Sequence, residues 1–236
     1  MTYDSFDKVL FSADGFGKFG ALDAEEDWDC EARRYYFNIA GKFGAQVQAV
    51  LKKAAGLDIR IICPLHGPVL KENLGHYLGL YDIWSSYGVE SEGVMIACAS
   101  LHGNTAAAME KLAEMLKTRG CPKVVLTDLT RAEPSEALED AFRYGKLVLA
   151  SSSYNGGMTP AMEDFLHHLK AKSYQKRTAA LVENGTWAPC ANRAMRELLG
   201  QMKDICILDE TVTLRGKLKQ ADMPALEALA EALTKD

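Results

Sequence analysis

Short apolar runs alternate with longer amphipathic segments through the second part of the chain. The apolar runs are residues 93–99, 123–129, 146–152, 177–184 and 205–216. Segments with a 3.6-residue period follow them at residues 105–118, 134–144, 160–169, 190–202 and 223–233. Apolar strands separated by amphipathic helices are typical of a parallel sheet with helices on both faces. Residues 91–236 are therefore predicted to form a doubly wound five-stranded parallel α/β domain.

The first part of the chain, residues 1–90, has fewer predicted strands. Residues 8–20 predict a strand that runs into a glycine-rich loop, and residues 58–70 predict a strand that ends in a His-Gly-Pro turn. Helices are expected over 29–56, with a break near Gly41, and over 74–87, followed by a linker at 88–93. Two strands are marginal as an independent sheet. We therefore expect this segment to be an incomplete part of a larger fold.

Composition and charge narrow the possible partners. The chain has 236 residues, of which 48% are hydrophobic, and a formal net charge of -5. The charge gives no reason to expect nucleic acid or an anionic membrane as a partner. The apolar runs are too short to span a membrane, and the acidic, polar N-terminus does not resemble a signal peptide.

The cysteine pattern predicts a reducing compartment. Six cysteines lie far apart without a CxxC pair, and Cys63, Cys98 and Cys206 lie within apolar runs. Such residues are typical of small core side chains rather than of a disulfide framework. We therefore expect a cytoplasmic protein with these three cysteines in its core.

The loop after the first strand of the second domain has the features of an anion site. It reads "SLHGNT", Ser100–Thr105, with a hydroxyl at each end and a helix beginning at its close. Loop and helix N–H groups can bind an anion there, although the same residues also serve as an ordinary helix cap. The loop matches neither GxxxxGK[ST] nor GxGxxG. It favours a monophosphate held by neutral donors.

Two further loops carry one aromatic residue each among glycines and amides. They are "SSSYNGGMTP" (151–160), with Tyr154, and "ENGTWAP" (183–189), with Trp187. Ligands of doubly wound sheets bind beyond the carboxyl ends of the strands, so the two aromatics can flank a flat ring while N–H groups bond its edge. Both could instead be packing residues. Together with the first loop they predict a flavin mononucleotide (FMN) site with these cofactor-binding residues: Ser100, Leu101, His102, Gly103, Asn104, Thr105, Ser152, Ser153, Tyr154, Asn155, Gly156, Gly157, Asn184, Gly185, Thr186 and Trp187.

These segments resemble a known family. "VMIACASLHGNTAAAMEKLAEML", "SSSYNGGMTPAMEDFL" and "LVENGTWAPCANRAM" are similar to the flavodoxin-like half of the A-type flavoproteins, also called flavodiiron proteins. "KVLFSADGFGKFG", "ARRYYFNIAGKFGAQVQAVLKKAAGLDI" and "ICPLHGPVL" resemble the C-terminal part of that family's metallo-β-lactamase-like domain. The resemblance covers essentially the whole chain, and it implies a flavodoxin-like domain at 91–236 after a truncated lactamase-like segment at 1–90.

The resemblance implies a di-iron site of which only a part is expected here. The family's "SxDxFG" and "PxHGP" motifs supply one carboxylate and one imidazole, which fall on Asp14 and His66. The remaining ligands come from an upstream HxExDH cluster and a further histidine, and this sequence contains no HxExDH. A di-iron centre needs several carboxylate and imidazole ligands. We expect the site to be incomplete or absent, and the acidic stretch at Glu25, Glu26, Asp27 and Asp29 to be a solvated loop.

The resemblance also implies partners. The leading interpretation is an FMN-binding electron-transfer flavoprotein that accepts electrons from a rubredoxin-like or reductase donor and forms a homodimer, because half a sandwich leaves apolar surface uncovered. The alternative is an oxygen or nitric oxide reductase completed by a separate chain that carries HxExDH. A third is a flavin-free scaffold, which the well-formed cofactor loops disfavour. Whether Met1 is the true start or the other half is encoded separately stays open.

Overall fold

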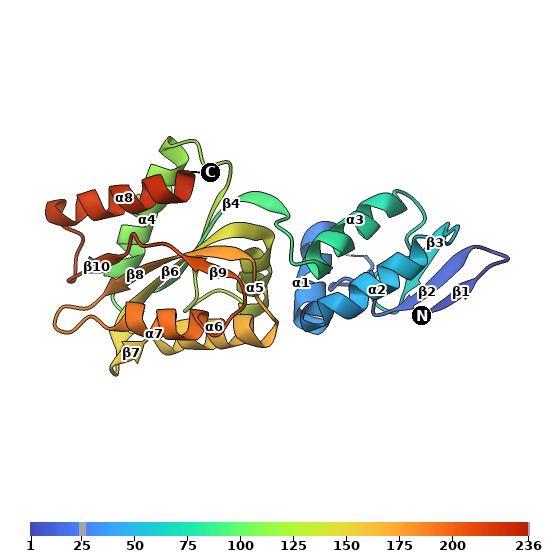
Figure 1. The fold of residues 1–236 in the computed structure, drawn as a ribbon, viewed down its shortest axis with the longest axis horizontal. Coiled ribbons are helices and arrows are strands. Elements are labelled where there is room, and N and C mark those ends of the chain that lie inside the picture. The colour runs from blue at the N-terminus through green and yellow to red at the C-terminus, as the bar shows by residue number, and fades with distance from the viewer. Residues whose placement is uncertain (24–26, 236) are drawn as a thin grey trace. The chain divides into compact units, whose positions relative to one another are not determined.

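The computed structural model describes residues 1–23 and 27–235, and the chain divides into two compact units, Met1–Glu90 and Ser91–Asp236 (Figure 1). No helix among the described residues has the length and apolar character needed to cross a bilayer.

The second unit contains a sheet whose main path is five parallel strands. In chain order these are β4 (Ser91–Ala99), β5 (Val124–Asp128), β6 (Tyr144–Tyr154), β8 (Arg177–Asn184) and β10 (Val212–Leu214). They lie in the order β10-β8-β6-β4-β5. The first strand, β4, therefore lies between β5 and β6. The chain passes from β4 to β5 on one side and then crosses to β6 on the other side. This is the flavodoxin-like strand order, so the predicted fold class is confirmed.

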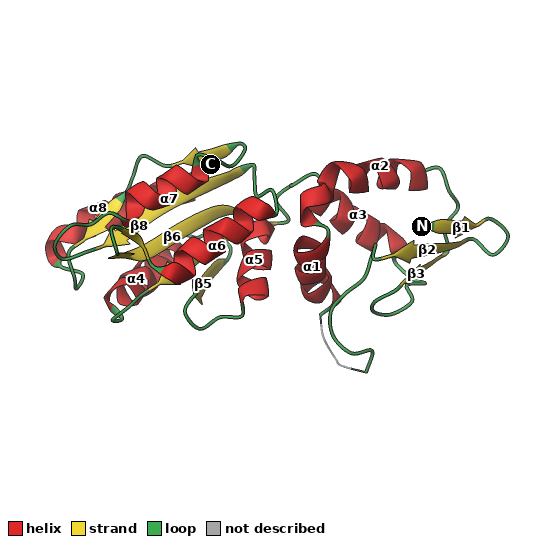
Figure 2. Ribbon diagram, turned by 90° about the horizontal axis from the view of Figure 1, so that it is seen from below, coloured by secondary structure: helices red, strands yellow, loops and turns green. Residues whose placement is uncertain are grey.

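Helices cover both faces of this sheet. They are α4 (Asn104–Thr118), α5 (Pro134–Arg143), α6 (Pro160–Ala171), α7 (Ala191–Leu199) and α8 (Met223–Thr234), with a short 3-10 turn, η2 (Gln220–Asp222), before the last. In Figures 1 and 2, α4 and α8 lie on one face, and α5, α6 and α7 lie on the other. Two of the helices, α5 and α6, begin on a proline, whose fixed φ suits the first helical turn.

The core explains why the strands are uniformly apolar. Ile96, Val148 and Val182 of the three central strands are fully buried, and they pack with Leu112 of α4 and Leu229 of α8. Because helices cover both faces of the sheet, successive residues of a strand are buried on alternate faces. Each such side chain contributes about 1.5–3 kcal/mol through burial.

The structure corrects four expectations for this unit. The apolar run 205–216 is two strands, β9 (Ile205–Ile207) and β10, because the polar residues 209–211 interrupt it, and Cys206 is exposed rather than in the core. The predicted linker 88–93 overlaps β4, which begins at Ser91. The predicted loop 151–160 begins inside β6, which continues to Tyr154 and forms a hairpin with β7 (Gly157–Met158).

The first unit has a small mixed sheet and three α-helices. Its strands are β1 (Thr2–Asp4), β2 (Val9–Ala13) and β3 (Ile61–Pro64); β2 pairs with β1 in the antiparallel sense and with β3 in the parallel sense. Its helices are α1 (Trp28–Ile39), the 3-10 turn η1 (Gly41–Phe43), α2 (Gly44–Ala54) and α3 (Leu74–Ser85). The predicted helix break near Gly41 is confirmed. The three-residue strand β1 was not predicted, because a run so short carries no periodic signal.

Aromatic rings and one buried ion pair hold the first unit together. The rings of Tyr36 and Tyr81 meet edge to face with centroids 5.2 Å apart, and Trp84 packs against both. Beside them, the Arg33 guanidinium donates to both carboxylate oxygens of Glu90, at 2.6 and 2.7 Å, and the Trp84 indole N–H donates to the same carboxylate at 2.6 Å. Arg33 is 1% exposed and Glu90 is 9% exposed at the side chain, so the pair is desolvated.

One face of the small sheet is apolar and uncovered. Along β2, Leu10 and Ser12 are buried, whereas Phe11 between them is 52% exposed. Cys63 pairs with Phe11 on the neighbouring strand and is half-buried, and Leu65 just beyond it is exposed. Exposed apolar side chains gathered on one sheet face are typical of a surface that another element covers.

The buried ion pair gives a stability prediction. Glu90→Ala leaves the Arg33 guanidinium and the Trp84 indole N–H without this acceptor, and breaking a buried pair on one side costs about 3–5 kcal/mol. We expect that loss in the free energy of unfolding of the first unit, measured by urea denaturation and tryptophan fluorescence. The exposed Glu92 is the matched control, and Glu92→Ala should change the free energy by less than about 0.5 kcal/mol. Equal effects of the two substitutions would contradict the prediction.

Candidate functional site

The strand register brings three of the predicted loops to one edge of the sheet. Ala99 of β4 pairs with Ser151 of β6, and Ser152 of β6 pairs with Asn184 of β8. The segments that follow these positions begin side by side at the carboxyl ends of the strands. Here β4 and β6 flank the point at which the strand order reverses, which is where open α/β sheets bind their ligands.

The first loop has hydrogen-bonding groups without partners. The Ser100 hydroxyl oxygen is buried and has no hydrogen-bond partner among the described residues. The backbone N–H groups of 101–105 likewise have no acceptor within the described part of the chain. They lie at the N-terminus of α4, which begins at Asn104 after Gly103. Unpaired donors at a helix N-terminus suit an oxyanion, so this loop fits a phosphate group.

The second loop is a tight hairpin rather than an irregular segment. Tyr154 pairs with Gly157, and the two residues between them, Asn155 and Gly156, have φ of 47° and 77°. Positive φ at both central positions defines the type I′ turn, which Asn-Gly favours. The Asn-Gly pair in the sequence was the signal for this hairpin. The turn leaves Tyr154 44% exposed next to the exposed residues Asn155 and Gly156.

The third loop is fixed at its ends and exposed in its middle. The Ser153 hydroxyl accepts from the Cys190 N–H at 2.9 Å, and a side chain at Gly185 would come within 3.0 Å of that hydroxyl. Between these anchors, Trp187 is 91% exposed. The sequence did not indicate Cys190 as part of the site, because its contribution is a backbone N–H.

Hydrogen bonds also tie these loops to each other and to the end of β10. The Thr105 and Ser152 hydroxyls are 3.1 Å apart. The Asn184 side-chain amide donates to the Gly216 carbonyl and accepts from the Gly216 N–H, both at 2.9 Å. The segment after β10 is therefore a fourth wall of the site. It was missed because residues 205–216 were predicted as one continuous strand.

The buried groups beneath the loops fix their shape. The Glu183 carboxylate, 8% exposed, accepts from the Asn192 N–H at 2.9 Å and from the Thr213 hydroxyl at 2.8 Å. Below the first loop, burial raises the pKa of the Cys98 thiol to about 12, so this thiol is neutral at physiological pH. It serves as a small apolar side chain rather than as a nucleophile.

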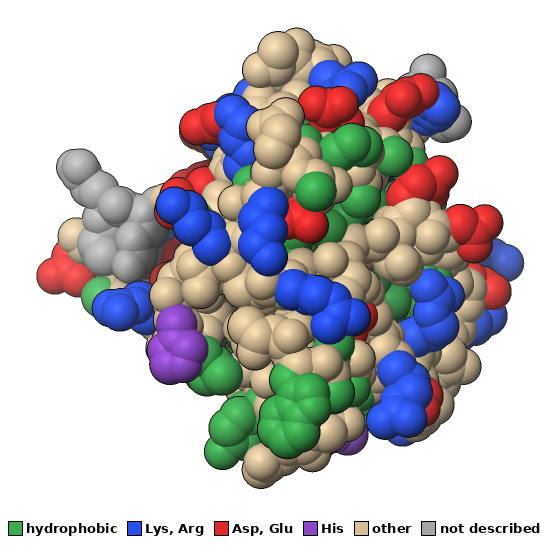
Figure 3. Space-filling model, turned by 90° about the vertical axis from the view of Figure 1, so that its left-hand side faces the viewer, with side chains coloured by type: hydrophobic (Ala, Val, Ile, Leu, Met, Phe, Trp, Pro, Cys, Tyr) green, Lys and Arg blue, Asp and Glu red, His purple; other side chains and the backbone are tan. Residues whose placement is uncertain are grey.

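Space-filling views show what this edge of the sheet presents to solvent. Figure 3 looks onto the side at which β7 and β10 lie in Figure 1. Basic side chains lie across the middle of this face above a group of apolar side chains, and acidic ones are seen mostly toward its rim. Leu101, Tyr154 and Trp187 are all exposed apolar residues of the loops described above.

The first unit brings the two predicted metal residues together. The His66 Nε2 atom lies 3.7 Å from Asp14 Oδ1, and the Tyr35 hydroxyl donates to the same carboxylate oxygen at 3.3 Å. Burial and the neighbouring Asp14 carboxylate raise the pKa of Tyr35 to about 12. Ala13 and Phe16, on either side of Asp14, have φ of 51° and 65°, a strained conformation for residues with a side chain.

The side chains near Asp14 and His66 do not fit a di-iron centre. The described residues contain no group of three or more His, Cys, Asp or Glu side chains arranged to hold a metal. Of the acidic stretch, Glu25 and Glu26 lie outside the described residues. Asp27 caps α1, and Asp29 lies 2.7 Å from His76. One carboxylate and one imidazole do not supply the ligand set of two iron ions.

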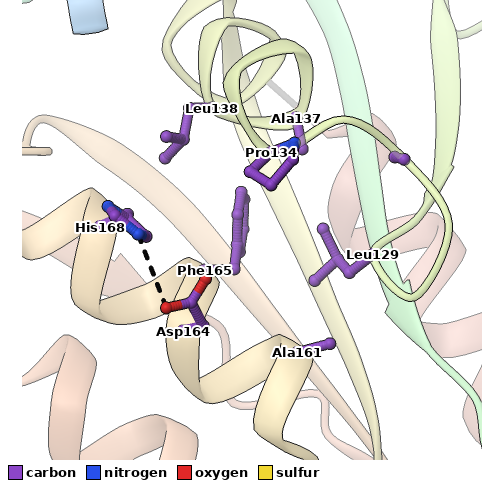
Figure 4. A pocket seen from close by; sticks show the side chains of 9 residues that line it. Leu129, Pro134, Ala137, Leu138, Ala161, Asp164, Phe165 and His168 are labelled. Atoms are coloured by element: carbon purple, nitrogen blue, oxygen red, sulfur yellow. Dashed lines mark ion pairs between the residues drawn. The ribbon is translucent and has the colours of Figure 1, made fainter.

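A separate hollow lies between α5 and α6. It measures about 190 Å³ and is walled mainly by apolar residues, among them Leu129, Leu138 and Phe165 (Figure 4). His168 and Asp164, 3.6 Å apart on α6, lie at its side. None of the predicted cofactor-binding residues lines this hollow, so it is distinct from the loops at the carboxyl edge.

Comparison with known proteins defines the class of this fold and site. Residues 95–229 match the Flavodoxin domain family, which is more than half of the chain. The chain belongs to the flavodoxin-domain family. It is 24% identical to the anaerobic nitric oxide reductase flavorubredoxin of Shigella flexneri over 242 residues. Its fold matches the rubredoxin oxygen:oxidoreductase of Desulfovibrio gigas (22% identity) and the flavodiiron protein of Giardia intestinalis (23% identity), each with a TM-score of 0.87.

The chain spans only part of the length of these proteins. The matches cover 98% of this chain but 49% of the flavorubredoxin, 60% of the Desulfovibrio protein and 59% of the Giardia protein. Both units therefore have the fold of corresponding parts of flavodiiron proteins, which confirms the resemblance found in the sequence.

Proposed function

We propose that this protein is an electron-transfer flavoprotein that binds FMN at the carboxyl edge of the larger sheet. The observation that carries the proposal is the buried, unpartnered Ser100 hydroxyl beside the open N–H groups of residues 101–105. A buried hydroxyl without a partner costs free energy, and a phosphate oxygen removes that cost. The first loop, Ser100–Thr105, would hold the phosphate.

The other two loops would hold the ring. Ser152, Ser153 and the hairpin Tyr154–Gly157 would form one wall, and Asn184–Trp187 the other. The exposed rings of Tyr154 and Trp187 can flank a flat heterocycle, and the hairpin N–H groups can donate to its edge. When bound, the flavin supplies the ability to accept and pass on electrons one or two at a time. The chain's own residues bind the flavin, orient it and set the polarity around it.

The electron donor and the compartment follow from the same proposal. We propose a rubredoxin-like or reductase donor, by analogy with the flavorubredoxin and the rubredoxin oxygen:oxidoreductase that this chain resembles. The described residues contain no disulfide, which supports a reducing, cytoplasmic setting.

A second candidate function is oxygen or nitric oxide reduction with a separate chain that supplies the missing ligands. The observation that favours it is the approach of His66 to Asp14, 3.7 Å apart beside strained backbone. Strained residues persist where the surrounding structure holds them, often at functional sites. In our leading proposal these two residues are vestigial, and this chain alone does not hold a di-iron centre.

Ser100→Ala tests the FMN site. Removing a hydrogen bond to a charged group costs about 1.5–3 kcal/mol, so the FMN dissociation constant should rise at least about tenfold. Riboflavin, which lacks the phosphate, should bind the wild type and the variant equally. Fluorescence titration measures the dissociation constants of FMN and riboflavin. Thr130→Val, in the loop after β5, is the matched control and should leave both constants unchanged. No FMN binding by the wild type would overturn the proposed function.

Iron loading separates the two candidate functions. After anaerobic reconstitution with ferrous iron, we expect metal analysis to find well under one iron ion for each chain, because only one carboxylate and one imidazole converge. The double variant Asp14→Ala/His66→Ala should consume oxygen at the same rate as the FMN-loaded wild type. Stoichiometric iron that the double variant loses would favour the reductase.

We propose that a second copy of the chain covers the apolar face of the small sheet. The exposed Phe11 and Leu65 support this assignment. Static light scattering at micromolar concentration should give the mass of a dimer, and Phe11→Lys should shift it toward the monomer, because a buried unpaired charge opposes association. The control is Phe6→Lys, at the exposed turn between β1 and β2. A monomeric wild type would count against this arrangement.

A further inference from the structure

A partly enclosed cavity lies inside the first unit, where the segment after β2 meets the helices α1, α2 and α3. It measures about 170 Å³ and shares no residue with the loops of the proposed flavin site. Most of its wall consists of aromatic and aliphatic side chains, among them Phe16, Tyr36, Val47, Val50, Leu51 and Tyr81. Asp14 and Gln46 also line the cavity, and both are exposed, which places its opening at these two residues.

Three aromatic side chains form the buried end of the cavity. Phe16, Tyr36 and Tyr81 are each at most 3% exposed. The Phe16 N–H donates to the Tyr81 hydroxyl at 2.7 Å, and the two ring centroids are 4.3 Å apart. This hydrogen bond holds Phe16 at its φ of 65°, a strained conformation that persists only where neighbouring groups fix it. Contacts within the first unit therefore set the shape of this end of the cavity.

One hydroxyl at the buried end lacks a hydrogen bond. The Tyr36 hydroxyl is buried and has no partner anywhere in residues 1–23 and 27–235. The other two tyrosine hydroxyls of the cavity wall are engaged. That of Tyr81 accepts from Phe16, and that of Tyr35 donates to the Asp14 carboxylate. The unsatisfied Tyr36 hydroxyl costs free energy until a ligand atom pairs with it.

The chemistry of the wall restricts what can occupy the cavity. Burial, and to a smaller extent the neighbouring Tyr87, raises the pKa of Tyr36 above its usual range, so its hydroxyl keeps its proton and is a donor. A buried water usually needs about three hydrogen bonds, whereas an apolar cavity of roughly 150 Å³ stays dry and accepts a benzene-sized molecule. The Asp14 carboxylate at the opening disfavours an anion. A neutral ligand with an apolar body and one acceptor atom satisfies all three conditions.

We propose that this cavity binds a small, neutral, single-ring molecule with one hydrogen-bond acceptor, of the class of aromatic ketones and aldehydes. The ring would pack among Phe16, Val47 and Val50, and the carbonyl oxygen would accept from the Tyr36 hydroxyl. The site lies wholly within the first unit. The inference therefore goes beyond the proposed FMN binding and does not depend on it.

The test titrates the full chain with acetophenone and with α-methylstyrene, in which a CH₂ group replaces the carbonyl oxygen. Methyl NMR resonances of Val47 and Val50 give both dissociation constants. The variant is Tyr36→Phe. Tyr174→Phe is the matched control, because Tyr174 is 1% exposed, its hydroxyl likewise has no partner among the described residues, and it lies in the larger unit.

We expect Tyr36→Phe to raise the acetophenone dissociation constant about tenfold, because the ketone oxygen loses its donor. The constant for α-methylstyrene should stay the same or fall, since the variant removes an unpaired hydroxyl from beside an apolar ligand. Tyr174→Phe should leave both constants unchanged. Val50→Phe, which fills the cavity from a half-buried position, should abolish binding of both compounds and leave FMN binding intact.

The proposal is overturned if neither compound shifts the Val47 and Val50 methyl resonances, or if Tyr36→Phe weakens both compounds equally. Resonances that move with protein concentration and not with either compound would assign the cavity to a second copy of the chain, and would also overturn it. FMN titration of the same samples keeps the two proposals apart. Lost FMN binding in the wild type removes the proposed function alone, because no residue of the cavity belongs to the flavin loops.

Discussion

The parallel pairing of β6 with β4 on one side and β8 on the other is the constraint on which the candidate site depends. It places Ala99 beside Ser151 and Ser152 beside Asn184, so three loops begin at one edge of the sheet. The buried apolar faces of these strands fix that register, because a slip by one residue would turn each core side chain to the wrong face. The positions of the loop side chains therefore depend on the packing of the strands beneath the loops.

The two units differ in how completely their polar groups are brought together. In the larger unit, the Thr105–Ser152, Ser153–Cys190 and Asn184–Gly216 contacts tie four segments together at one edge of the sheet. In the smaller unit, Asp14 and His66 approach each other without a third ligand among the described residues. This contrast is why the proposed function assigns binding chemistry to the loops of the larger unit and not to a metal site in the smaller one.

The parts of the fold that repeat along the chain could be predicted from sequence, since period and apolar content report burial on both faces of β4, β6 and β8. The three loops were also predicted, because glycines, amides and hydroxyls after apolar strands are unusual. Short elements were missed: β1 has three residues, and the β6–β7 hairpin was predicted only as a loop although its Asn155-Gly156 pair is a hairpin signal. Cys206 was predicted to be buried because it lies in an apolar run. The structure leaves it exposed on the short strand β9. Contributions made through backbone atoms, such as that of Cys190, have no signature in residue type.

The central claim is that the backbone of the first loop, together with Ser100, recognises a phosphate group. Amide NMR spectra of the protein with FMN and with riboflavin test it most directly. The account predicts that the amide resonances of residues 101–105 shift strongly with FMN and much less with riboflavin, while those of residues 155–157 shift with both. Equal shifts of the first-loop amides with the two ligands, or none with either, would contradict it.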